Sequence, residues 1–97
     1  MIPYAIFEDY QFEWDPQKAE TNLKRHGLSY ERTRTIWDDE KRIYYHLCDQ
    51  SETRWLVIAR LGPRVYMSAV VTYREDRIRL ISARPASKRE IERYHHD

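Results

Sequence analysis

The chain has 97 residues, a length that suits one domain and excludes the second core of a multidomain enzyme. Hydrophobic residues make up 41% and aromatic residues 13%, enough apolar surface for a small core and too much for a disordered chain. The single cysteine, Cys48, excludes an internal disulfide and a thiolate zinc site. We expect one folded domain over residues 1–97, cytoplasmic and without a membrane partner, because the sequence has no signal-like start and no long apolar run.

The charges are balanced overall but unevenly placed. The net charge is +1, yet residues 51–97 carry ten of the 17 Lys and Arg and only six of the 16 Asp and Glu. The densest basic stretch contains Arg77, Arg79, Arg84, Lys88, Arg89 and Arg93. Such a stripe is typical of a surface that binds a polyanion, since each neutralised phosphate releases condensed counterions. The alternative is a solvated charged face with no ligand.

Two helices are predicted near the N-terminus. Asp15 supplies a helix cap and Pro16 the first helical position, so that a helix is expected over residues 16–26. Gly27 ends it, because glycine readily takes the left-handed conformation that follows a helix. Ser29 caps a second, shorter helix. Residues 1–11 precede these signals as an N-terminal extension, and residues 10–14 are a candidate edge strand.

From residue 41 onward, β-branched and aromatic residues at hairpin spacing predict an antiparallel sheet. The four expected strands are residues 42–48, 54–61, 64–74 and 77–84. A C-terminal helix is predicted over residues 87–94, since Ser87 and Glu90 have the spacing of a capping box. The following pair, His95 and His96, is interpreted as a frayed end rather than a metal site. The fold class is therefore α+β, with two N-terminal helices, a four-stranded, mainly antiparallel sheet and a C-terminal helix.

Strand alternation divides the predicted sheet into two faces. In the last strand it places Ile78, Leu80 and Ser82 on one face and Arg77, Arg79, Ile81 and Ala83 on the other. In the first sheet strand it places Arg42, Tyr44 and His46 together. We expect the helices to cover the apolar side and the polar side to form an RNA platform, because guanidinium groups bind phosphates and aromatic rings stack on bases. Antiparallel sheets often expose a polar face without any ligand, which is the alternative.

The motifs of several enzyme classes are absent. The sequence has no nucleophile elbow, Walker loop or dinucleotide-binding glycine motif, and no His and Cys spacing typical of a metal site. We therefore expect neither a cofactor nor a bound metal. Cleavage of RNA by its own 2′-OH remains open, because the reaction needs a base, a cation for the charged phosphorane and an acid. Arg, Lys, His and Tyr side chains suffice for these roles.

Four residues of the first predicted helix have divided interpretations. His26 titrates near neutral pH and is a candidate base or acid, but at a helix end it equally suits a structural role that complements the helix dipole. Lys18 and Lys24 are phosphate ligands if the helix borders the sheet, and solvated charges otherwise. Asn22 is an indifferent helix former beside the apolar stripe, which indicates a specific hydrogen bond.

Two blocks of the sequence resemble the BrnT family of toxins. The first runs from Phe12-Glu13-Trp14-Asp15-Pro16 through Lys18 and Asn22 to Lys24-Arg25-His26-Gly27. The second runs from Arg77-Ile78-Arg79-Leu80-Ile81-Ser82-Ala83-Arg84 through Lys88-Arg89-Glu90 to Arg93-Tyr94, and Arg54-Trp55 falls between the two blocks where the family has the same pair. The resemblance covers residues 12–94 in the right order.

The resemblance implies a compact RelE-like fold and a metal-independent endoribonuclease that inhibits translation in bacteria. It also implies a type II toxin–antitoxin pair, in which a BrnA-like ribbon-helix-helix antitoxin neutralises the toxin and alone contacts operator DNA. The alternatives are a catalytically weak relative that acts as corepressor with its antitoxin, and a generic RNA-binding domain.

The matching positions supply the candidate site residues. The catalytic candidates are His26, Lys18, Arg77, Arg79 and Tyr94. The RNA-binding candidates are Lys24, Arg54, Arg84, Lys88 and Arg89. We assign His26 or a lysine to the proton transfers, and Arg77 and Arg79 to the scissile phosphate, as a hypothesis.

Overall fold

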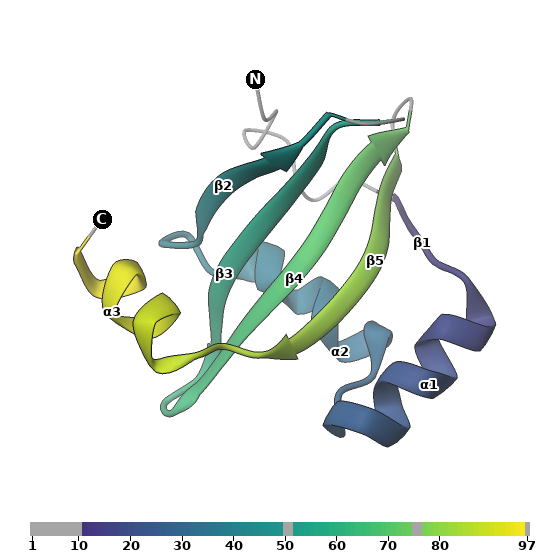
Figure 1. The fold of residues 1–97 in the computed structure, drawn as a ribbon. Coiled ribbons are helices and arrows are strands. Elements are labelled where there is room, and N and C mark those ends of the chain that lie inside the picture. Colours follow the sequence, from purple (N-terminus) through teal and green to yellow (C-terminus); the bar gives the residue numbers. More distant parts are fainter. Residues whose placement is uncertain (1–10, 50–51, 75–76, 97) are drawn as a thin grey trace.

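The computed structural model describes residues 11–49, 52–74 and 77–96 (Figure 1). Along the chain the elements are β1 (Gln11–Glu13), α1 (Pro16–His26), α2 (Tyr30–Thr33), the 3-10 helix η2 (Arg34–Asp38), β2 (Ile43–Cys48), β3 (Arg54–Gly62), β4 (Val65–Arg74), β5 (Arg77–Pro85) and α3 (Lys88–His96). The strands form one sheet in the order β1-β5-β4-β3-β2, in which the β1–β5 pair is parallel and the other pairs are antiparallel. The predicted α+β class is confirmed, and the candidate edge strand is present as β1. Of the predicted N-terminal extension, residues 1–10 lie outside the described ranges.

The helix boundaries follow the predicted capping signals. The Asp15 carboxylate accepts a hydrogen bond from the backbone N–H of Gln17 at 2.9 Å, which satisfies one of the free donors at the start of α1. Gly27 ends α1 with φ of 69°, and its N–H donates to the Leu23 carbonyl at 2.8 Å. Ser29 caps α2. The second predicted helix is not one continuous α-helix. Its α-helical part, α2, ends at Thr33, and the 3-10 helix η2 follows from Arg34. No described helix is long and apolar enough to cross a membrane.

The main core lies between one face of the sheet and the N-terminal helices, and α2 lies behind the strands in Figure 1. We call this side of the sheet the helix-covered face. Its buried strand residues are Val57, Ala59, Met67, Ala69, Val71, Ile78, Leu80 and Ala83, and the helical segment contributes Leu28, Tyr30, Ile36 and Trp37. Alternate residues of each strand therefore enter this core, as the period of a β-strand requires.

A β-bulge at Ile81 interrupts that alternation. Val70 pairs with Ser82 and Val71 pairs with Leu80, so Ile81 has no partner position in β4. The Ile81 carbonyl instead accepts a hydrogen bond from the Tyr30 hydroxyl at 3.0 Å. The extra residue shifts the phase of the strand, and Ala83, at 1% exposure, joins the core. Two predictions for this strand are therefore wrong: Ala83 does not share the face of Arg77 and Arg79, and Ser82 does not share the face of Ile78 and Leu80.

The predicted polar platform is also divided between two faces. Tyr44 and Trp55 pack against the core, and His46 pairs with Trp55, with ring centroids 5.4 Å apart. His46 therefore belongs to the helix-covered face, whereas Arg77 and Arg79 lie on the other. Sequence alternation correctly grouped the residues within β2, but it carries no information on which faces of β2 and β5 coincide.

The opposite face of the sheet carries α3 over one end. Under α3 lie Ile58 and Ser68, which are buried although they point away from the main core. The N-terminal helices pack on the other side of the sheet. We call the rest of the side that carries α3 the arginine face. Its members are Arg54 and Leu56 of β3, Val70 and the buried Thr72 of β4, and Arg77, Arg79 and Ser82 of β5, with Arg84 at the border with α3.

The Asn22 side chain fixes α1 to the bulged strand. Its Nδ2 donates to the Leu28 carbonyl at 3.1 Å, and its Oδ1 accepts from the Ala83 N–H at 3.2 Å.

We expect Asn22→Leu to lower the free energy of unfolding by about 2–4 kcal/mol, because it leaves two buried backbone groups without partners. Urea denaturation measures this loss. Thr21→Ala, at the exposed neighbouring position of α1, is the control and should change stability by less than about 0.5 kcal/mol. Equal stability of the two variants would contradict the role of Asn22.

Candidate functional site

A cross-strand row of polar residues crosses the arginine face. Arg54 pairs with Thr72, Thr72 pairs with Arg79, and Arg79 pairs with Glu13 of β1. Because adjacent strands lie about 4.8 Å apart, the Cα atoms of Arg54 and Arg79 are separated by about 10 Å. The next row holds Leu56, Val70 and Ser82. Two guanidinium groups therefore flank a partly apolar strip, an arrangement suited to a charged backbone that carries flat bases.

The two arginines of this row each contact one carboxylate. Arg79 NH1 lies 3.3 Å from Glu13 Oε2, and Arg54 NH2 lies 3.6 Å from Glu52 Oε1. Between them, the Thr72 hydroxyl donates to the Thr53 carbonyl at 2.6 Å. A guanidinium has several N–H donors in a planar fork, so a single carboxylate contact leaves donors for a second anion.

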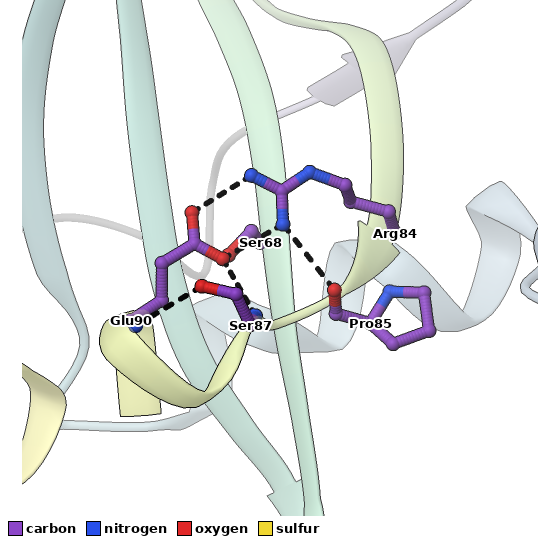
Figure 2. Close-up of polar contacts among 5 residues, drawn as sticks. All are labelled: Ser68, Arg84, Pro85, Ser87 and Glu90. Atoms are coloured by element: carbon purple, nitrogen blue, oxygen red, sulfur yellow. Dashed lines mark hydrogen bonds and ion pairs between the residues drawn. The ribbon is translucent and has the colours of Figure 1, made fainter. Parts of the chain in front are cut away.

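Arg84 occupies a tighter cluster where β5 meets α3 (Figure 2). Its NH1 and NH2 atoms lie 2.7 Å and 2.8 Å from the two carboxylate oxygens of Glu90, a bidentate ion pair. Glu90 Oε1 also accepts from the Ser68 hydroxyl and from the Ser87 N–H, each at 2.8 Å. The Ser87 Oγ in turn accepts from the Glu90 N–H at 3.2 Å, which confirms the predicted capping box.

This cluster holds α3 on the sheet. The hydrogen bonds from Arg84 outweigh the effect of burial and, with those from Ser87 and Ser68, lower the pKa of Glu90 to about 2. The same contact raises the pKa of Arg84. Both groups are therefore charged at neutral pH. In this structure Arg84, a predicted RNA-binding residue, serves as a clamp at the edge of the arginine face.

Tyr94 lies on the buried side of α3 and is only 8% exposed. Its hydroxyl donates to Asp39 Oδ2 at 2.6 Å, and burial together with this hydrogen bond raises the pKa of the Tyr94 phenol. Burial also opposes ionisation of Asp39, but hydrogen bonds from Tyr94 and from the N–H groups of Arg60 and Lys41 outweigh it and lower the pKa of Asp39. Tyr94 thus connects α3 to the end of η2. Its hydroxyl is engaged there rather than presented to the arginine face.

The candidates on α1 belong to a helix that packs on the helix-covered face, whereas Arg77 and Arg79 lie on the arginine face. Asn22 binds Ala83 near the end of β5, and the exposed Arg77 begins the strand about 20 Å away along an extended chain. Lys18 is exposed on α1, and Lys24 is exposed and lies 3.3 Å from Glu20. His26, half-buried in the last turn of α1, is not brought together with Arg77 and Arg79.

The remaining candidates, Lys88 and Arg89, are exposed in the first turn of α3. At the other end of this helix, His95 Nε2 lies 2.9 Å from the Tyr66 hydroxyl. Since α3 includes His95 and His96, the interpretation of these histidines as a frayed end is wrong. Within residues 11–49, 52–74 and 77–96, no three His, Cys, Asp or Glu side chains form a group that could hold a metal ion.

Sequence reasoning did not single out Glu13 as a site residue. The T-shaped contact of Phe12 with Trp37, at 5.4 Å, fixes Phe12 on the helix-covered face. Its neighbour Glu13 therefore points to the arginine face. Alternation along β1 could have predicted that Glu13 and Phe12 lie on opposite faces of the sheet. The parallel pairing of β1 with β5 is a long-range contact that no local sequence pattern contains.

The low pKa of Glu90 predicts a pH-dependent contribution to stability. Since the pKa is about 2 in the folded protein and 4.5 for an ordinary glutamate, the unfolded chain binds this proton more readily. The stabilisation is therefore complete above the ordinary pKa and is lost as the pH falls toward 2. We expect the stability difference between the wild type and Glu90→Gln to shrink by at most about 3 kcal/mol between about pH 5 and about pH 2.

Urea denaturation across this pH range measures the effect. Glu92→Gln, at an exposed position on the same helix, is the matched control and should show a nearly constant difference from the wild type. A Glu90→Gln curve that runs parallel to the wild-type curve would contradict the assignment.

Comparison with known proteins identifies the fold and the family. A crystal structure of the Brucella abortus ribonuclease toxin BrnT is similar, with a TM-score of 0.62 and 18% sequence identity over 81% of this chain and 99% of that chain. Comparison with curated protein sequences yields no significant match. The family model described as the ribonuclease toxin BrnT of type II toxin–antitoxin systems matches residues 14–90, which include both arginines of the cross-strand row, Arg54 and Arg79. The chain therefore belongs to the BrnT family of ribonuclease toxins.

Proposed function

We propose that this protein is a metal-independent endoribonuclease toxin that binds RNA across the arginine face. The observation that carries the proposal is the row in which Arg54 and Arg79 flank Thr72 on a face that the N-terminal helices do not cover. Exposed Arg77 extends this positive surface toward β1. In a family of ribonuclease toxins, a sheet face opposite the N-terminal helices that carries several guanidinium groups is the best supported place for the substrate.

The proposed reaction is attack of an RNA 2′-OH on the adjacent phosphate. The new 2′-O–P bond forms, the P–O5′ bond breaks, and the products are a 2′,3′-cyclic phosphate and a free 5′-hydroxyl. Negative charge grows on the phosphate oxygens in the transition state, and the guanidinium groups of Arg79 and Arg77 are placed to stabilise it. Cations of this kind replace the role that a metal ion has in other nucleases.

We further propose that RNA cleavage inhibits translation and that a BrnA-like ribbon-helix-helix antitoxin neutralises the protein. An acidic segment of the antitoxin would cover the arginine face, because the same guanidinium groups bind carboxylates and phosphates. In this proposal only the antitoxin contacts operator DNA. The membership of the chain in a type II toxin–antitoxin family supports the existence of such a partner.

Removal of both phosphate-binding arginines of β5 tests the catalytic proposal. We expect the purified wild type to cleave a long single-stranded RNA in the presence of excess EDTA. Arg77→Ala/Arg79→Ala should lower the cleavage rate by at least about 100-fold, because it removes the charge that stabilises the phosphorane. Gel electrophoresis of the RNA over time gives the rates, with and without translating ribosomes.

The matched control is Arg32→Ala/Arg34→Ala, which removes the same charge from exposed positions on the helical side of the molecule. This variant should cleave at the wild-type rate. Full activity of the β5 double variant would exclude the proposed phosphate site. A wild type that retains RNA without cutting it, even with ribosomes, would favour the corepressor or RNA-binding alternative.

Charge reversal at Arg77 tests the antitoxin surface. Arg77 is exposed at the start of β5, so Arg77→Glu should leave the fold intact. We expect it to weaken antitoxin binding by about 10-fold or more and to reduce the salt dependence of affinity, because an attractive charge pair becomes repulsive. Calorimetric titration at two salt concentrations measures both effects. Unchanged affinity would exclude this face as the antitoxin site, and Arg32→Glu is the control for net charge.

A further inference from the structure

A carboxylate borders the proposed phosphate site. Glu13 and Arg79 are register partners in the parallel β1–β5 pair, and their charged groups lie 3.3 Å apart. Their side chains are 28% and 26% exposed, so the pair is accessible to solvent and to a ligand from the arginine face. Glu13 thus stands at the end of the row that continues through Arg79 and Thr72 to Arg54.

RNA cleavage requires a proton acceptor next to the group that binds the phosphate. The nucleophilic 2′-oxygen is next to the phosphate that it attacks, so the group that removes its proton must be next to the group that binds the phosphate. Glu13 and Arg79 have this relation. The proton-transfer candidates on α1 do not, because α1 lies against the other face of the sheet.

Two other glutamates near this face are less suited to the role. Glu90 accepts hydrogen bonds from Arg84, Ser68 and Ser87, so its lone pairs are occupied by the contacts that hold α3. Glu52 pairs with Arg54 at 3.6 Å, at the far end of the row from exposed Arg77. Only Glu13, among these three, lies beside β5 at the end of the strand that carries Arg77 and Arg79.

We propose that Glu13 is the general base of the reaction, an inference that rests on the proposed ribonuclease function. Its carboxylate removes the proton of the 2′-OH as the 2′-oxygen attacks phosphorus, while Arg79 stabilises the charge on the phosphate oxygens. The departing 5′-oxygen takes a proton from water, and Glu13 later releases its proton to solvent. Bonds and protons balance without a metal or a co-reactant.

The ion pair contributes little to holding β1 in place. Backbone pairing over Gln11–Glu13 and the contact of Phe12 with Trp37 already attach this strand. Partly exposed ion pairs add only about 0–1 kcal/mol to stability. Glu13→Gln should therefore fold, because its amide oxygen still accepts a hydrogen bond from Arg79 while the basic carboxylate is lost.

Cleavage and binding must be measured separately to distinguish a base from a structural residue. We expect Glu13→Gln to lower the single-turnover cleavage rate by about 100-fold or more, the usual contribution of a general base. Its affinity for a 2′-deoxy substrate analogue, which cannot be cut, should stay within a few-fold of the wild type. Glu13→Asp, which keeps the carboxylate, should cleave faster than Glu13→Gln. Glu31→Gln removes an exposed carboxylate from α2, on the helical side of the molecule, and should retain wild-type activity.

The outcomes separate the role of Glu13 from the function itself. A wild type that cuts neither free nor ribosome-bound RNA overturns the proposed function and, with it, the role of Glu13. An active wild type with an equally active, folded Glu13→Gln overturns the role alone. If circular dichroism finds Glu13→Gln unfolded, the test uses Glu13→Asp, whose carboxylate is one methylene farther from the substrate. This variant should bind the analogue normally and cleave at least tenfold more slowly than the wild type. A wild-type cleavage rate of Glu13→Asp would then overturn the role of Glu13.

Discussion

The β-bulge at Ile81 is the constraint on which the arginine face depends. In an uninterrupted strand, Arg79 and Arg84 would point to opposite faces because they are five residues apart. The additional residue in β5 reverses the phase between them, so that both lie on one face while Ala83 enters the core. The Tyr30 hydroxyl of α2 donates to the carbonyl of the bulge residue, and Asn22 of α1 accepts from the N–H of Ala83, two residues later. The helical face of the molecule thereby determines the chemistry available on the opposite face.

The arginines of β5 differ in how strongly the protein itself engages them. Arg84 is held by two short contacts to one carboxylate, and its fixed position secures α3. Arg79 has a longer contact, 3.3 Å, to Glu13, while Arg77 is exposed at the start of the strand. An external anion must compete with the internal one, so its access to guanidinium groups improves from the α3 border toward β1. This gradient favours the β1 end of the sheet as the place of chemistry and the α3 end as scaffold.

The sequence correctly predicted the features that depend on neighbouring residues, such as helix starts and the grouping of residues within one strand. Capping residues such as Asp15, Ser29 and Ser87 located the helices, and strand alternation grouped residues correctly within β2. It failed where a non-local contact decides the outcome. The bulge depends on partners in α1 and α2, and the parallel pairing that brings Glu13 to Arg79 joins strands from opposite ends of the chain. The resemblance of the two sequence blocks to one family identified candidate residues, but not which of them share a face.

The contact between Glu13 and Arg79 also bears on how the face distinguishes a transition state from bound RNA. In the proposed reaction, Glu13 competes with the phosphate for Arg79 before the proton is transferred, which limits ground-state affinity. When the 2′-OH proton passes to Glu13, the carboxylate becomes neutral and its attraction for the guanidinium weakens. At the same moment, the phosphate oxygens gain charge, so Arg79 shifts its interaction toward them. An interaction that strengthens only as the reaction proceeds accelerates it, whereas uniformly tight binding does not. A partly occupied arginine is in this respect better suited to catalysis than a free one.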